Sequence, residues 1–102
     1  MIKHVESMEE LKEVLSKGDV LLDFFAPWCG PCRMLGPVLE ELDTKEDFNV
    51  QIVKVDTDEA PELAGAFQVE TIPTLFYFSE GKAVRRYSGF LREDQIRDFC
   101  KK

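Results

Sequence analysis

The stretch Asp23-Phe24-Phe25-Ala26-Pro27-Trp28-Cys29-Gly30-Pro31-Cys32 joins an apolar segment to a Cys-x-x-Cys motif. Residues 20–26 are apolar except for Asp23, as expected of a strand that is buried on both faces. Beyond the motif, apolar residues recur with the period of a helix. They are Leu35, Val38, Leu39 and Leu42. The two cysteines therefore lie where a buried strand passes into a helix.

This position gives the motif its chemistry. A cysteine at a helix N-terminus faces unpaired N–H groups and the positive end of the helix dipole, which stabilise its thiolate. We therefore expect Cys29 to be the nucleophile and Cys32, within one turn, to resolve the mixed disulfide that forms. Gly30 lets the backbone of a partner approach, and Pro31 stiffens the turn.

Three other interpretations of the motif are open: a metal site, a structural disulfide and a pair of inert core thiols. A zinc site needs four ligands, and only Cys29, Cys32, Cys100 and His4 are available. A purely structural disulfide is not expected in a reducing compartment, and inert core thiols do not suit a Gly-Pro turn beside Trp28. A Cys-x-x-Cys motif between a buried strand and a helix instead favours redox exchange.

Length and charge narrow the class of protein. The 102 residues predict one domain, 1–102, and the net charge of −7 argues against partners that are nucleic acids or anionic membranes. No apolar run approaches the roughly 18 residues of a membrane span, and no signal peptide is expected. An odd count of three cysteines argues against a secreted disulfide scaffold, so the cytoplasm is the expected location.

Segments whose apolar residues have the spacing of a strand alternate along the chain with segments that have the spacing of a helix. We expect a strand at 2–5 and a helix that begins with the capping box Ser7–Glu10 and ends at Gly18. Strands at 20–26 and 50–55, helices around 35–42 and 60–67, a hairpin over 74–87 and a helix at 92–101 follow. The order βαβαβαββα predicts an α/β fold, a mixed sheet with helices on both faces.

Over its whole length the sequence resembles the thioredoxin family, first through its Trp-Cys-Gly-Pro-Cys segment. Further family positions are matched in register. They are the helix-kinking Pro37, the strand lysine Lys54, the cis-proline segment Thr71-Ile72-Pro73-Thr74, Gly81 and Gly89. The resemblance implies the thioredoxin fold, with about five strands and about four helices. Cys-Gly-Pro-Cys is typical of the reducing members of the family.

The resemblance assigns roles to two charged strand residues. Asp23 would accept and donate a proton for Cys32, and burial should raise its pKa. The alternative is an aspartate that is bonded to backbone amides. Lys54 would tune Asp23, or else simply pack its stem and extend its head to water.

The resemblance also implies a substrate surface. Pro73 would be cis and would leave the backbone of Thr71 free to pair with an extended substrate. We call the apolar residues expected around Cys29 the collar. They are Trp28, Gly30, Pro31, Ile72, Pro73, Gly89 and Phe90. The alternative for Ile72 and Phe90 is an ordinary core position. Phe25, Ser88 and Phe90 depart from common family residues, which bears on partner preference.

The expected function is that of a cytosolic thiol–disulfide oxidoreductase that reduces disulfides in client proteins. It would be monomeric, hold no bound cofactor or metal, and be re-reduced by a separate thioredoxin reductase. A disulfide oxidant or isomerase on the same fold, and a redox-silent binding module, are the alternatives. Cys100 shares a helical face with Ile96 and Phe99 and is expected in the core; a regulatory or dimer-forming thiol is the alternative.

Overall fold

The computed structural model describes residues 1–102 and is built on a five-stranded sheet in the order β1-β3-β2-β4-β5. β1 (Lys3–His4), β3 (Gln51–Asp56) and β2 (Asp19–Phe25) run parallel to one another. β4 (Thr74–Ser79) pairs antiparallel with β2, and β5 (Lys82–Ser88) with β4. The mixed sheet predicted from the sequence is confirmed.

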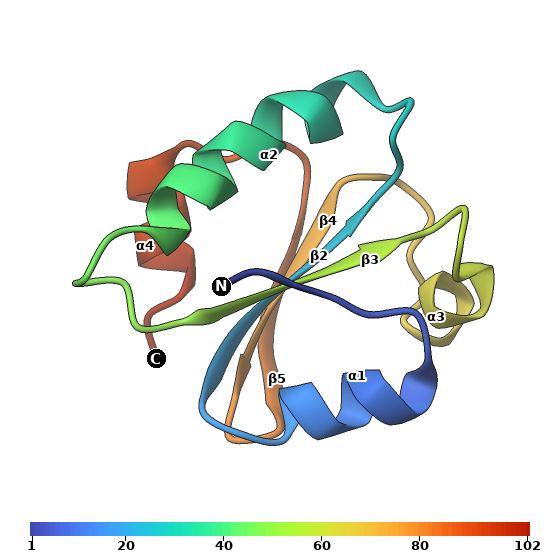
Figure 1. Cartoon of the computed structure of the whole chain (residues 1–102), viewed down its shortest axis with the longest axis horizontal. Helices are drawn as coiled ribbons and strands as arrows, with labels where there is room; N and C mark the ends of the chain where they lie inside the picture. Colours follow the sequence, from blue (N-terminus) through green and yellow to red (C-terminus); the bar gives the residue numbers. More distant parts are fainter.

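Helices cover both faces of this sheet (Figure 1). The helices α1 (Met8–Leu15) and α3 (Pro61–Ala66) lie on one face. The helices α2 (Gly30–Asp43) and α4 (Glu93–Phe99) lie on the other. None of the four is both long and apolar enough to cross a membrane.

The alternation of side chains along β2 divides the core in two. Val20, Leu22 and Phe24 join the cluster under α1 and α3, whereas Leu21 joins the cluster under α2 and α4. Because strand side chains alternate between faces, Asp23 points to the same side as Leu21. The one carboxyl of this buried strand is thereby directed toward the helix that begins at the dithiol.

Several element ends differ from the sequence expectations, most clearly at β1, α1 and α4. β1 has two residues rather than four. α1 ends at Leu15, and its cap is Ser16, whose N–H and hydroxyl both donate to the carbonyl of Glu13. Gly18 is therefore not the helix cap. It does adopt the left-handed conformation (φ +65°), but in the turn into β2, where its carbonyl accepts from the N–H of Glu80.

The last helix also differs, because it ends at Phe99 rather than Lys101. Its N-cap, which the sequence did not identify, is Arg92. The N–H of Arg92 donates to Oε1 of Gln95 at 2.9 Å, which satisfies one of the N–H groups free at a helix start.

Candidate active site

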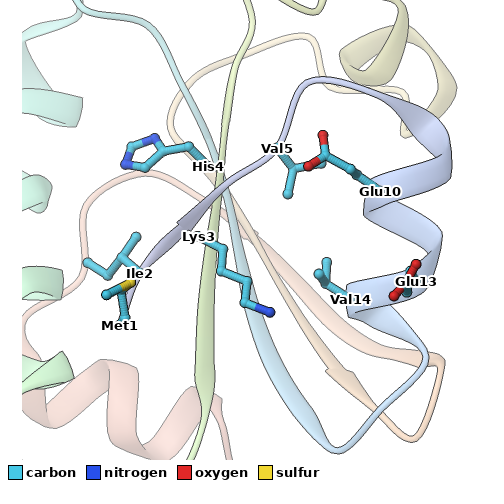
Figure 2. Close-up of a pocket in the computed structure, with 8 residues that line it drawn as sticks. All are labelled: Met1, Ile2, Lys3, His4, Val5, Glu10, Glu13 and Val14. Carbon is cyan, nitrogen blue, oxygen red and sulfur yellow. The ribbon is translucent and has the colours of Figure 1, made fainter.

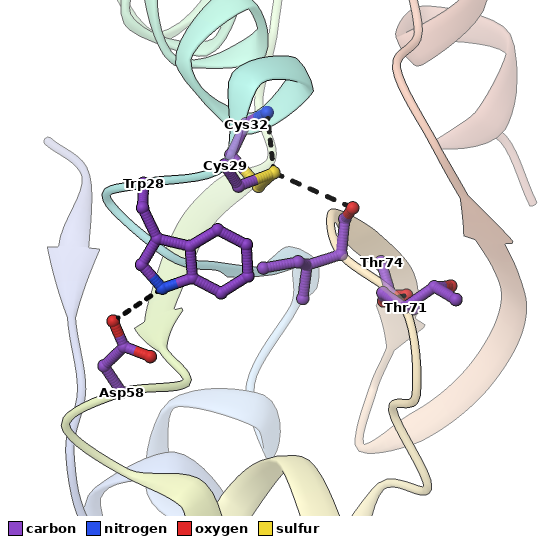
Figure 3. Close-up of a disulfide and its surroundings, with 7 residues drawn as sticks. Trp28, Cys29, Cys32, Asp58, Thr71 and Thr74 are labelled. Carbon is purple, nitrogen blue, oxygen red and sulfur yellow. Dashed lines mark hydrogen bonds between the residues drawn. A yellow bond between two sulfur atoms is a disulfide. The ribbon is translucent and has the colours of Figure 1, made fainter.

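Cys29 is the N-cap residue of α2 and is paired with Cys32 in a disulfide, their Cα atoms 5.2 Å apart. The backbone N–H of Cys32 donates to Sγ of Cys29 at 3.2 Å (Figure 3). Both cysteines are buried, whereas Gly30 and Pro31 between them are exposed. The same N–H contact, together with the helix dipole, would stabilise a Cys29 thiolate in the reduced form.

The indole of Trp28 lies beside the dithiol and is 68% exposed. Its Nε1–H donates to Oδ2 of Asp58 at 3.0 Å (Figure 3). The N–H of Asp58 in turn donates to Oδ1 of Asp56, at the end of β3. Asp58 thus orients the exposed ring. Sequence reasoning missed it, because it lies 30 residues from Trp28 in an acidic segment that gives no distinguishing signal.

The loop before β4 approaches the dithiol from the other side. The peptide bond between Ile72 and Pro73 is cis, as the family resemblance implies. The carbonyl oxygen of Ile72 lies 3.7 Å from Sγ of Cys29, and Ile72 packs against the small cluster formed by Ala26, Cys29 and Cys32. Ile72 therefore belongs to the surroundings of the dithiol and not to either large core cluster.

The backbone of this loop is only partly free for a substrate. The hydroxyl of Thr74 donates to the carbonyl of Thr71 at 2.6 Å, so that carbonyl already has a partner. The N–H of Thr71 donates to no backbone acceptor and lies on an exposed residue. The N–H of Gly89 donates to the carbonyl of Pro73 at 2.9 Å, which ties β5 to the loop.

The remaining collar residues occupy different settings. Pro73 is buried and Gly89 is half-buried with φ +125°, a conformation that glycine adopts readily. Phe90 packs against the cluster under α2 and α4 and not against the dithiol, so its place in the collar stays a prediction. Met34, on the second turn of α2, is 64% exposed and adds an apolar side chain that the sequence analysis did not single out.

Asp23 lies on β2, only 1% exposed, directly opposite Lys54 of β3 in the strand register. Its Oδ1 atom has no hydrogen-bond partner, which argues against an aspartate held by backbone amides. Burial raises the pKa of Asp23 to about 7, and the positive charge of Lys54 opposes that rise. The carboxyl therefore changes its protonation near neutral pH, as a proton donor and acceptor must.

Lys54 holds its ammonium group over the ring of Phe25, with Nζ 4.4 Å from the ring centroid. Both residues line a hollow of about 340 Å³ between the sheet and α2. Cys32 and Pro37 line the same hollow, so it joins the lysine to the second cysteine. The stacking on Phe25 fixes the cation close to the dithiol end of α2.

The third cysteine packs in a different core cluster from the dithiol. Cys100 follows α4 and is buried in the cluster under α2 and α4, with no disulfide partner. Burial raises the pKa of its thiol to about 12, so almost no thiolate forms near neutral pH. The core position expected for Cys100 is confirmed.

A second hollow, of about 550 Å³, lies between the edge strand β1 and α1 (Figure 2). Lys3 extends toward α1, where Glu10 and Glu13 lie, whereas the ring of His4 points the other way (Figure 2). No cysteine lines this hollow, and nowhere in the chain do three metal-ligating side chains gather. The potential zinc ligands Cys100 and His4 thus do not lie together with the dithiol.

Comparison with known proteins agrees with this geometry. The thioredoxin family model matches residues 2–102. A thioredoxin of Bacillus subtilis is 46% identical over 87 residues, which cover 85% of this chain and 84% of that protein. A thioredoxin of Chlamydia trachomatis is 47% identical over 92 residues, 90% of this chain and 89% of that one.

A solved structure of a mutant thioredoxin from Halobacterium salinarum superposes with a TM-score of 0.88 at 38% identity. The match covers 99% of this chain and 92% of that one. The agreement therefore covers the whole sheet and its helices. Sequence, fold and redox-active pair therefore show that the chain belongs to the thioredoxin family, as a thiol–disulfide oxidoreductase that reduces disulfides in client proteins.

Proposed function

We propose that Cys29 and Cys32 divide the reduction of a client disulfide into two exchanges. The Cys29 thiolate attacks one client sulfur, and the other client sulfur leaves as a thiolate. Cys32, deprotonated, then attacks Sγ of Cys29, which releases the second client thiol and closes the Cys29–Cys32 disulfide. The client gains two electrons and two protons. The N–H of Cys32 that points at Sγ of Cys29 is the observation that carries this assignment.

We propose that Asp23 is the base that takes the proton from Cys32 in the second exchange. Its pKa of about 7 matches this task at neutral pH, because a base works best when its pKa lies near the working pH. Lys54 favours the charged form of Asp23 and so tunes how readily the carboxyl releases its proton. Lys54 and Cys32 line one hollow at this end of α2, so the tuning charge and the thiol that loses its proton lie in the same region.

The collar is proposed to receive an extended client segment. Exposed apolar groups beside the sulfurs, Trp28 and Pro31 among them, suit contact with a protein surface. The free N–H of Thr71 can donate to a client carbonyl in the manner of a short added strand. Recognition through backbone and shape predicts loose selectivity for client side chains.

The spent disulfide must be reduced again before another round. We propose that a separate thioredoxin reductase supplies the two electrons, that the protein acts as a monomer without a bound cofactor, and that it works in the cytoplasm. A buried Cys100 without a partner suits a reducing compartment, where a disulfide framework does not form.

A coupled assay tests this proposal. The oxidised protein is mixed with NADPH, a bacterial thioredoxin reductase and insulin, and NADPH oxidation is followed. We expect NADPH consumption that requires both insulin and this protein, and that is lost in the double variant Cys29→Ser/Cys32→Ser. Insulin reduction by the double variant would contradict the dithiol assignment. Activity with dithiothreitol but not with the reductase would contradict only the partner.

A further inference from the structure

The loop that faces the dithiol is bound at its start by an arginine of the edge strand β5. Nη1 of Arg86 donates to the carbonyl of Phe67 at 2.9 Å, and Nη2 donates to the carbonyl of Gln68 at 2.7 Å. These carbonyls end α3, where Gln68 adopts a left-handed conformation (φ +54°). Helix-terminal carbonyls carry partial negative charge, so a guanidinium fork suits them well.

The guanidinium of Arg86 also stacks on an aromatic ring. Its Cζ lies 5.0 Å from the ring centroid of Phe76, which is its register partner across β4 and β5. Stacking on an aromatic face restricts the planar fork and favours the two hydrogen bonds that it makes. The end of α3 is thereby fixed to the sheet, three residues before Thr71.

A second β5 side chain binds the far end of the same loop. Oγ of Ser88 lies 3.1 Å from Oγ1 of Thr74, its register partner on β4. The Thr74 hydroxyl donates to the carbonyl of Thr71 (Figure 3). Residues 86 and 88 lie two apart on one strand and share a face, so both reach the loop from the same side.

We propose that Arg86 and Ser88 are positioning residues that hold the segment Thr71–Pro73 in place for client binding. Arg86 fixes where the segment begins, and Ser88 orients the Thr74 hydroxyl that fixes Thr71. The segment in turn sets the distance between the carbonyl of Ile72 and Sγ of Cys29, 3.7 Å. This inference rests on the proposed client-binding role of that segment, and it assigns to β5 the control of client affinity.

The chain provides a matched control one residue away. Arg85 donates to the carbonyls of Phe99 and Lys101 at the end of α4, and its Cζ lies 5.5 Å from the ring centroid of Tyr77. It thus makes the same kind of contacts as Arg86, but on the opposite face of β5 and away from the substrate loop. A general loss of β5 or helix-end stability would affect both arginine variants alike.

The test compares Arg86→Gln, Arg86→Lys, Ser88→Ala and Arg85→Gln with two substrates. Insulin requires the client surface, whereas dithiobis-nitrobenzoate is a small disulfide that needs only access to the sulfur of Cys29. For Arg86→Gln we expect the KM for insulin to rise roughly three- to tenfold with little change in kcat. The rate with dithiobis-nitrobenzoate should stay unchanged, and Arg85→Gln should behave as the unchanged protein with both substrates.

The conservative variants sharpen this expectation. Arg86→Lys keeps the charge but not the fork, so its KM for insulin should lie between those of the unchanged protein and Arg86→Gln. Ser88→Ala removes one hydroxyl and should raise that KM by a smaller factor. All rates are measured at a temperature where circular dichroism shows every variant folded; if Arg86→Gln does not fold, Arg86→Lys and Ser88→Ala carry the test.

Two results would overturn the inference. One is an unchanged KM for insulin in the folded Arg86 and Ser88 variants. The other is an equal rise in Arg85→Gln, or an equal loss of rate with dithiobis-nitrobenzoate, because either would indicate a general structural effect. Failure of the proposed function would look different, since the unchanged protein itself would then not reduce insulin.

Discussion

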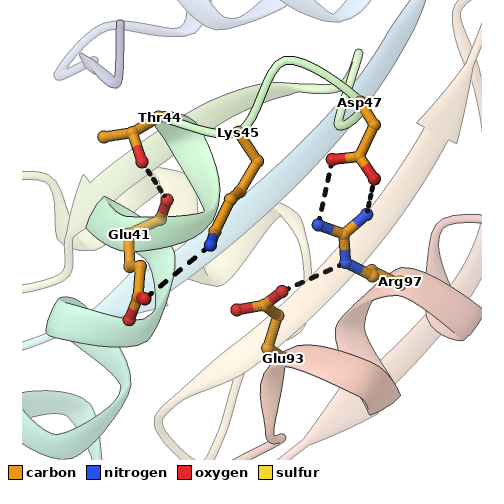
Figure 4. A network of polar contacts seen from close by, with 6 residues as sticks. All are labelled: Glu41, Thr44, Lys45, Asp47, Glu93 and Arg97. Carbon is orange, nitrogen blue, oxygen red and sulfur yellow. Dashed lines mark hydrogen bonds and ion pairs between the residues drawn. The ribbon is translucent and has the colours of Figure 1, made fainter.

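Carboxyl groups lie near both ends of helix α2, but the one at the N-terminal end is buried and those at the C-terminal end are paired and exposed to solvent. At the N-terminal end, Cys29 caps the helix with its sulfur, and the carboxyl of Asp23 is buried on the adjoining strand with one oxygen unpartnered. At the C-terminal end the groups are paired and solvated. The Thr44 hydroxyl donates to the carbonyl of Glu41, and Arg97 bridges Asp47 and Glu93 (Figure 4).

The two ends move the pKa of an aspartate in opposite directions. The hydrogen bond from Arg97 lowers the pKa of Asp47, which is largely exposed. Burial raises the pKa of Asp23 to about 7, and the nearby charge of Lys54 only partly opposes this. A carboxylate that is paired at the surface stays charged at neutral pH. The buried one gains and loses its proton there, so the chemistry belongs at the N-terminal end.

Replacing the nucleophile should have the largest effect. For Cys29→Ser we expect client reduction to fall by roughly three orders of magnitude or more, because a serine hydroxyl is not ionised and cannot exchange with disulfides. Cys32→Ser should still attack insulin but stop at the mixed disulfide, which mass spectrometry detects as a covalent adduct. Adduct formation by Cys29→Ser through Cys32 would reverse the two roles.

Removing the buried carboxyl should have the next largest effect. In Asp23→Asn the second exchange loses its base, and we expect single-turnover release of the reduced client to slow by roughly a hundredfold at pH 7. The dependence of this step on pH around 7 should also flatten, because that is the pKa of Asp23. Formation of the mixed disulfide should change far less. An unaltered pH profile for client release would remove Asp23 from the mechanism.

Ionisation of the buried Asp23 should lower the free energy of unfolding of the protein. Between the usual aspartate value of 3.8 and its raised pKa of about 7, folded Asp23 holds a proton that the unfolded chain has lost. Its contribution to stability is therefore present at low pH and lost as pH rises to about 7. We therefore compare the free energy of unfolding of Asp23→Asn with that of the unchanged protein by urea denaturation. Between low pH and pH values above 7, this difference should shift in favour of Asp23→Asn by on the order of 4 kcal/mol. A pH-independent difference between the two would contradict the raised pKa.

Much of this site could be predicted from the sequence, because its signals are local. The strand, the Cys-x-x-Cys spacing and the helical stripe lie within about twenty residues of one another, so Cys29 and Cys32 follow from short-range pattern alone. Asp23 stands out for a similar reason, as the one charge in an apolar run. The cis state of Pro73 came from family resemblance, since composition does not indicate it.

Contacts between distant segments could not be predicted in this way. Asp58 binds Trp28 from 30 residues away, and Arg86 binds Phe67 from 19 residues away. Neither has a local pattern that distinguishes it from other surface charges. Gly18 shows the converse error. It adopts the left-handed conformation that the sequence predicts, but it does not end the helix. Ser16 caps the helix earlier in the chain, because its hydroxyl donates to the carbonyl of Glu13.

The C-terminal end of α2 should give the smallest effect. For Arg97→Ala we expect no change in the rate of client reduction and a slight loss of thermal stability that added salt reduces, because exposed ion pairs are screened. The contribution of the pair should be present above the usual aspartate pKa and fade as pH falls, since the pKa of Asp47 is lowered. A changed redox rate would show that the two ends are coupled.

The reduction potential of the Cys29–Cys32 couple tests the central claim most directly. The protein is equilibrated with glutathione buffers of graded ratio, and its free thiols are trapped and counted. Thioredoxins have potentials near −270 mV and oxidising relatives lie at about −180 to −120 mV, so a reductant with this site should fall near the lower value. A potential above roughly −200 mV would contradict the account and indicate an oxidant or isomerase.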